Sequence, residues 1–148
     1  MALNEENVII GDIINICLEE NLTRTRIVQY AGASGDYNPL HTDEIFATQV
    51  AGQKSVFAHG LLLMGMCGKA VTDYVGDGRL RKFGVRFTKQ AFPGDALYAR
   101  LEVKDIHEEN GEKLIELDIA VTNQNEETVL TGYATAVINE RLSKKGVS

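Results

Sequence analysis

The second half of the chain alternates apolar and polar residues with a period of two, which is the period of a strand buried on one face. Four runs show this alternation, and they cover residues 83–87, 97–103, 115–121 and 129–137. Asn110-Gly111 separates two of the runs and is a strong signal for a tight hairpin. The segment 123–127 is typical of a longer hairpin loop. We therefore expect four strands that are joined mostly by hairpins.

The first half of the chain begins with one further strand and then turns helical. Aliphatic residues at positions 14, 16 and 18 alternate with less apolar neighbours after Gly11-Asp12, which predicts a half-buried strand. Thr23 or Thr25 can act as the N-cap of a helix that continues through residue 31. A shorter helix is expected over residues 43–52, with two acidic residues in its first turn and a glycine at its end.

The most apolar stretch of the chain follows His59-Gly60 and covers residues 61–71. It is apolar on every side, which describes a helix wrapped by other structure. Gly65 and Gly68 would each cost this helix about 1 kcal/mol relative to alanine. We therefore expect a sheet or a partner backbone to approach it closely. One helix inside a strongly curved antiparallel sheet satisfies the whole pattern, so we predict an α+β fold with residues 1–148 as a single domain.

Composition narrows the class of protein. Of 148 residues, 44% are hydrophobic and 24% are charged, which is ordinary for a globular domain. A net charge of -6 argues against non-specific nucleic-acid binding. The longest apolar stretch is too short to span a bilayer, and the chain does not open like a signal peptide. We expect a cytoplasmic protein whose Cys17 and Cys67 are reduced thiols.

Asp36 and His41 are the first candidates for chemistry. On a continuous helix, residues five apart would lie about 140° apart. Gly35 and Pro39 make this segment a loop, so the two side chains can converge. A carboxylate and an imidazole are the groups that general acid–base chemistry uses most. The pair alone has an ordinary alternative, an Asx-turn followed by a helix-capping histidine.

The residues around this pair resemble a known family. The run YAGASGDYNPLHTD at 30–43 closely resembles the hydratase signature of the MaoC-like (R)-specific enoyl-CoA hydratases. The run AHGLL at 58–62 resembles the family's second motif, and GVRF at 84–87 with FPGD at 92–95 resembles its third. The resemblance covers nearly the whole chain, although Ala33 stands where the family more often has another small or aliphatic residue. It implies a hotdog fold, normally a homodimer or a higher homo-oligomer.

The resemblance also implies roles for individual residues. Asp36 and His41 match the family's catalytic dyad, and Gly60 matches the glycine whose backbone N–H faces the thioester carbonyl. Members with this dyad hydrate trans-2-enoyl thioesters to (3R)-3-hydroxyacyl thioesters, or run the reverse dehydration. The substrate would be an acyl-CoA or acyl-ACP thioester, so coenzyme A or phosphopantetheine enters with the substrate and no separate cofactor is expected. Simple close packing is the alternative reading of Gly60.

Other polar residues carry weaker predictions. Asn38 can brace the dyad through its amide or simply form the turn. His59 can orient the loop or line the pocket, or it can be a buried structural histidine. Arg86 belongs to five cations between residues 79 and 89, which form either a solvated strand face or a site for the phosphates of coenzyme A. The three histidines have no metal-ligand spacing, so we expect no metal site.

Two other functions remain open at this point. A hotdog thioesterase would use the same scaffold and a carboxylate to direct water at the carbonyl instead. A non-catalytic acyl-binding module, or the partner subunit of a heterodimeric dehydratase, would not need the dyad. The presence of both Asp36 and His41 therefore favours the hydratase.

Overall fold

The computed structural model describes residues 3–138 and builds them from five strands, two α-helices and one π-helical turn. In chain order these are β1 (Ile13–Glu19), α1 (Arg24–Ser34), the π-helical turn η1 (Phe46–Val50), α2 (Gly60–Val75), β2 (Leu80–Phe87), β3 (Leu97–Glu109), β4 (Glu112–Thr122) and β5 (Thr128–Val137).

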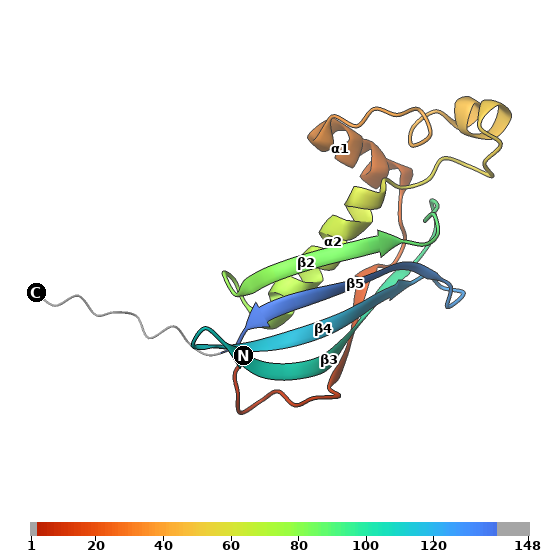
Figure 1. The fold of residues 1–148 in the computed structure, drawn as a ribbon. Helices are drawn as coiled ribbons and strands as arrows, with labels where there is room; N and C mark the ends of the chain where they lie inside the picture. Colours follow the sequence, from red (N-terminus) through yellow and green to blue (C-terminus); the bar gives the residue numbers. More distant parts are fainter. Residues whose placement is uncertain (1–2, 139–148) are drawn as a thin grey trace, which may run out of the picture.

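The five strands form one antiparallel sheet in the order β1-β3-β4-β5-β2, and α2 lies across one of its faces (Figure 1). Buried side chains of α2 and of the sheet make one apolar core, with Cys67 and Val71 from the helix and Leu101, Ile115 and Leu130 from the strands at its centre. Burying an aliphatic side chain of this size stabilises the fold by about 1.5–3 kcal/mol. The predicted α+β architecture is confirmed, and none of the described helices is long and apolar enough to cross a membrane.

The predicted turns and caps are mostly in place. Asn110 and Gly111 both have positive φ, 52° and 76°, as a tight hairpin between β3 and β4 requires. Thr23, not Thr25, caps α1, because its hydroxyl accepts a hydrogen bond from the N–H of Arg26 at 3.0 Å. The longer hairpin loop lies between β4 and β5 as expected.

The expectation that α2 is wrapped on every side is wrong for the described residues 3–138. Leu61 is 60% exposed, and Gly65, Lys69 and Asp73 continue an exposed stripe at four-residue spacing. Only one of the two internal glycines is explained by a close approach. A Cβ on Gly68 would lie 3.1 Å from the Phe83 ring, whereas a Cβ on Gly65 would meet nothing within 4 Å.

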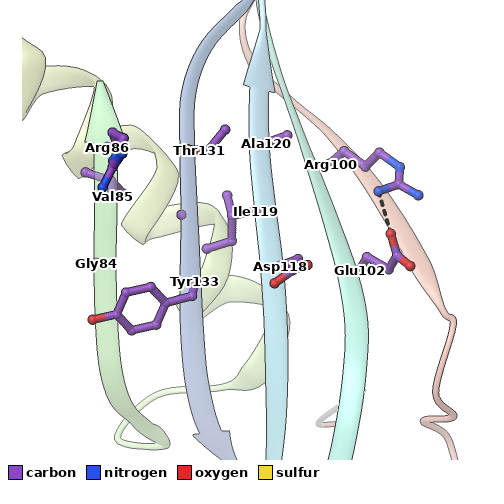
Figure 2. A pocket seen from close by; sticks show the side chains of 11 residues that line it. Gly84, Val85, Arg86, Arg100, Glu102, Asp118, Ile119, Ala120, Thr131 and Tyr133 are labelled. Atoms are coloured by element: carbon purple, nitrogen blue, oxygen red, sulfur yellow. Dashed lines mark hydrogen bonds and ion pairs between the residues drawn. The ribbon is translucent and has the colours of Figure 1, made fainter. Parts of the chain in front are cut away.

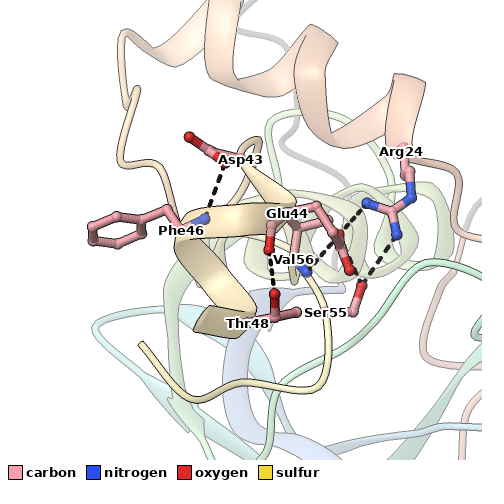
Figure 3. Close-up of polar contacts among 7 residues, drawn as sticks. All are labelled: Arg24, Asp43, Glu44, Phe46, Thr48, Ser55 and Val56. Atoms are coloured by element: carbon pink, nitrogen blue, oxygen red, sulfur yellow. Dashed lines mark hydrogen bonds and ion pairs between the residues drawn. The ribbon is translucent and has the colours of Figure 1, made fainter. Parts of the chain in front are cut away.

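The segment between α1 and α2 leaves the sheet and carries η1 away from it (Figure 1). Asp43 lies just before the helical turns and caps them, since its carboxylate accepts from the N–H of Phe46 at 3.0 Å. Glu44 ties the segment to α1 through Arg24 at 2.6 Å and accepts from the N–H of Val56 at 3.3 Å (Figure 3). Both bonds lower the pKa of Glu44, and the bond from Arg24 makes the larger contribution. The helix predicted over residues 43–52 is present over residues 44–50, and all of it after the first two residues is π-helical.

Candidate active site

The loop after α1 is shaped by its own side chains. Gly35 ends the helix in the left-handed region, with φ 74° and its N–H donating to Ala31 at 3.0 Å. The Asp36 carboxylate accepts from the N–H of Asn38 at 3.2 Å, and the Asn38 side chain accepts from the N–H of Leu40 at 3.0 Å. These are Asx-turns. Asn38 therefore has the turn-forming role that the sequence left open.

His41 has a fixed proton position. Its Nδ1 lies 2.7 Å from the carbonyl oxygen of Phe57. A carbonyl can only accept, so Nδ1 carries a proton, and in the neutral ring Nε2 is the nitrogen with the lone pair. The imidazole does not cap the following helix, because Asp43 does so. The bond to Phe57 thus fixes the orientation of the ring and leaves Nε2 as the nitrogen that can face a reactant.

Asp36 and His41 converge despite the five residues between them. One carboxylate oxygen of Asp36, one ring nitrogen of His41 and one of His59 all lie within 4.8 Å of one another. Two polar groups within this distance of each other can both be contacted by one water molecule. The two side chains therefore converge as predicted, and their catalytic role stays a prediction.

His59 joins this pair from the start of α2. It is only 2% exposed, and its Nε2 donates to the main-chain carbonyl of Asp36 at 3.0 Å. Its ring stacks on that of His41, with centroids 3.8 Å apart and planes 26° apart. Tyr30 packs edge-on against it, with centroids 4.8 Å apart. Burial, and to a lesser degree His41, lower the pKa of His59, while the Asp36 carbonyl opposes that shift. His59 is therefore neutral near pH 7.

The three converging groups are not well arranged to share a metal ion. Imidazole binds a metal along the lone pair in its own ring plane. The two rings are nearly parallel and stacked, so their lone pairs run side by side instead of meeting, and His59 uses Nε2 as a donor. Sequence spacing did not anticipate this cluster, because His41 and His59 are brought together by the fold. The arrangement suits proton transfer better than coordination.

Gly60 is the first residue of α2. The first free N–H groups of a helix end point outward and carry the positive end of its dipole. The N–H groups of Leu62 and Leu63 donate to the carbonyl of His59, whereas within residues 3–138 those of Gly60 and Leu61 have no acceptor. A Cβ on Gly60 would lie 3.0 Å from the Phe87 ring, so close packing is also real here.

A pocket of about 350 Å³ opens beside Gly60. Its lining includes Phe57, whose carbonyl holds His41, together with Phe87 and Lys89. Lys89 also forms an ion pair with Glu127 at 2.6 Å. The pocket therefore has a cation and the first residue of α2 in its lining, whereas Asp36 and His41 do not line it.

Arg86 is not brought to the dyad within the single chain. It lines a hollow of about 660 Å³ on the sheet face opposite α2, together with Arg100, Glu102 and Tyr133 (Figure 2). The other cations of the group are mostly engaged elsewhere. Arg79 donates to the carbonyl of Leu3, and Arg81 pairs with Glu112 at 2.8 Å. A role of Arg86 in binding the phosphates of coenzyme A therefore stays a prediction.

Sequence reasoning missed two contributors to the site. Tyr30 supports His59 from α1, and the carbonyl of Phe57 sets the tautomer of His41. Tyr30 opens the signature run and could have been singled out by that position. The role of Phe57 is a main-chain contact and leaves no signal in residue identity.

The fold and this site define a class of protein: an α+β domain with a carboxylate and an imidazole at the N-terminus of its central helix. A family model described as "MaoC like domain" matches residues 8–128, and the chain belongs to this family. The R-hydratase PhaJ1 of Pseudomonas aeruginosa has the same hotdog fold, with a TM-score of 0.82 and 25% identity over 95% of this chain and 88% of that one.

Curated relatives match over shorter stretches of their own length. The 3-hydroxyacyl-thioester dehydratase Y of Mycobacterium tuberculosis is 45% identical over 67 residues, which are 43% of this chain and 23% of the relative. The peroxisomal enoyl-CoA hydratase 2 of Arabidopsis thaliana is 31% identical over 123 residues, 81% of this chain and 36% of the relative. The chain thus spans about a third or less of these two proteins.

Proposed function

We propose that this chain is a hydro-lyase that hydrates trans-2-enoyl thioesters of coenzyme A or acyl carrier protein to (3R)-3-hydroxyacyl thioesters, or catalyses the reverse dehydration. The observation that carries the proposal is the convergence of the Asp36 carboxylate and the His41 ring within 4.8 Å. The N–H of Gly60 at the start of α2 adds to it. The names of the relatives, hydratases and dehydratases of acyl thioesters, point the same way.

The residues supply the steps that hydration needs. A water between Asp36 and His41 can donate one hydrogen bond to the carboxylate and one to Nε2 of His41. The pair removes its proton as the oxygen attacks the β-carbon, and a proton is then delivered to the α-carbon. The thioester oxygen carries the enolate charge between these events, and the N–H of Gly60 with the helix dipole stabilises it there.

The expected magnitudes are sufficient for a substrate that is already activated. A backbone donor at a developing oxyanion is worth about 3 kcal/mol. A positioned acid or base contributes roughly 10²–10⁴ in rate. The reaction changes no oxidation state and moves only protons and water, so no group beyond the thioester itself is required.

A single assay separates the candidate reactions. Purified protein is incubated with crotonyl-CoA, and enoyl absorbance and free thiol are followed together. Loss of absorbance without free thiol supports hydration, and free thiol would instead identify a thioesterase. If neither changes across a series of chain lengths, the chain is a binding module or a partner subunit and the proposal fails.

The dyad is tested by substitution. Asp36→Asn and His41→Ala should each lower turnover by at least about 10² while the fold is retained. His107→Ala is the matched control, because this histidine lies on β3 among the carboxylates of Asp105 and Glu116. Wild-type rates in either dyad variant would remove the assignment.

A further inference from the structure

We infer that His59 is a positioning residue that sets the placement of Asp36, His41 and Gly60 relative to one another; this inference rests on the proposed function. Each of the three groups comes from a different part of the segment after α1. His59 contacts two of them and is the direct neighbour in sequence of the third.

The link to Asp36 runs through the main chain. Nε2 of His59 donates to the Asp36 carbonyl at 3.0 Å, from a ring that is 2% exposed. A hydrogen bond in such a buried setting is stronger than one exposed to water. The carbonyl and the carboxylate belong to the same residue, so a fixed carbonyl restricts where the carboxylate can lie.

The link to His41 is the stack of the two rings at 3.8 Å. His41 is held at its other side by the Phe57 carbonyl at 2.7 Å. Tyr30 of α1 packs edge-on against His59 and restrains its ring in turn. The groups that face His59 are thus Asp36 and His41 from the loop and Tyr30 from α1.

The link to Gly60 is the helix start. His59 is the N-cap residue of α2, and its carbonyl accepts from the N–H groups of Leu62 and Leu63 at 3.1 and 3.4 Å. These bonds close the first turn and fix where the N–H of Gly60 points. A shift of the His59 backbone would therefore move the proposed oxyanion donor as well as the dyad.

A packing role alone does not account for a histidine here. Nδ1 of His59 is buried and has no hydrogen-bond partner within residues 3–138. Burying an unpaired polar atom costs stability, and an aromatic hydrocarbon of similar shape would avoid that cost. The imidazole is thus explained by the bond that it gives to Asp36.

Two substitutions separate the two contacts. His59→Phe keeps a ring that can stack on His41 but cannot donate to Asp36. His59→Gln keeps a donor near the position of Nε2 but loses the stack. Cys67→Ala, which shortens a fully buried side chain two turns further along α2, is the control for a loss of stability alone.

We expect His59→Phe to lower kcat by about 10²-fold, because displacing reacting groups by about 1 Å has that effect. KM should change much less. The pH profile of kcat/KM should shift in His59→Phe, since the spacing of the dyad changes. His59→Gln should lose less activity than His59→Phe. Cys67→Ala should lower the melting temperature and leave kcat and the pH profile as in the wild type.

The outcomes are distinguishable from failure of the proposed function. A wild-type protein without hydratase activity overturns that function, and crystal structures of the wild type and His59→Phe then decide the positioning role alone. In those structures the Asp36 carboxylate should move away from the His41 ring in the variant. An unchanged separation, or a His59→Phe enzyme with the kcat and pH profile of Cys67→Ala, overturns the inference.

Discussion

His41 and His59 each donate one ring N–H to a main-chain carbonyl, and the two rings use opposite nitrogens, Nδ1 in His41 and Nε2 in His59. His41 keeps Nε2 free, whereas His59 keeps Nδ1 free in a buried position. The sequence identified both residues but not this difference, because their partners, Phe57 and Asp36, contribute main-chain oxygens. At the residue scale, the sequence could single out these histidines as candidates, but it could not predict which nitrogen of each ring donates.

Gly60 allows a prediction at the same scale. An alanine there would place its Cβ 3.0 Å from the Phe87 ring, so the helix start or the ring must shift. Because the N–H of Gly60 would shift with the helix start, we expect Gly60→Ala to lower turnover by about 10- to 100-fold. Steady-state kinetics with an enoyl thioester measure this.

A second substitution checks the reason for that loss. Phe87→Leu added to Gly60→Ala should recover part of the rate, since it removes the ring that the new methyl group meets. Full activity in Gly60→Ala alone would show that the Phe87 ring moves aside and that the helix start stays in place.

At the scale of secondary-structure elements, the sequence located α2 well but described its surroundings poorly. Its apolar residues are so numerous that periodicity could not show which side stays open, and the exposed stripe at Leu61, Gly65 and Lys69 was missed. The strands were predicted more fully, because alternation with period two marks both their extent and their buried face. The π-helical form of η1 has no such signature.

The two glycines inside α2 should respond to alanine in opposite directions. Gly65→Ala should raise the free energy of unfolding by up to about 1 kcal/mol, because the site is open and alanine favours the helix. Gly68→Ala should lower it by about 1–3 kcal/mol, because its Cβ would crowd the Phe83 ring. Urea denaturation of both variants measures the difference. Equal effects would mean that Phe83 does not pack against α2 as described.

The link between Glu44 and α1 should weaken in acid. Hydrogen bonds from Arg24 and Val56 lower the pKa of Glu44 in the folded state. A lowered folded pKa gives stabilisation that is present above the ordinary value of 4.5 and is lost as the pH falls through the folded value. We expect the Val56 amide to lose protection from hydrogen exchange over that range.

Substitution at this link provides the control. In Glu44→Gln the protection of the Val56 amide should be weaker at neutral pH and should not change further in acid. Glu20→Gln, at an exposed site outside the segment, should behave as the wild type. Identical protection in Glu44→Gln and the wild type would show that this link does not hold the segment.

At the scale of the whole molecule, the sheet has two edge strands, β1 and β2. An edge strand presents unpaired N–H and C=O groups that another strand can pair with. Phe87, at the end of β2, is 46% exposed beside the pocket next to Gly60. We expect a homodimer in which β2 pairs with its own copy about a two-fold axis.

Light scattering tests this assembly. The mass should be twice that of the chain, and amides of β2 should lose protection from hydrogen exchange on dilution, when the dimer dissociates. A monomeric mass at all accessible concentrations would refute the dimer. Protection of β2 amides that stays the same on dilution would show that another surface forms the contact.

The overall architecture was the most predictable level. Strand alternation, the hairpin at Asn110-Gly111 and one central apolar helix leave few ways to build a sheet on a helix. What could not be predicted is the path of the segment from Asp36 to His59, because its bonds are set by main-chain contacts and by the stacking of His41 on His59. The fold could be predicted from the pattern of apolar and polar residues, whereas the geometry of the site depends on individual contacts that this pattern does not show.

The groups that meet at the dyad come from one uninterrupted stretch of the chain, from Tyr30 to Gly60. A reactive centre of this kind can be inherited, lost or exchanged between related domains as one block of sequence. Grafting residues 30–60 onto another member with a compatible sheet would transfer the complete constellation in one step, whereas centres assembled from distant segments need several coordinated replacements.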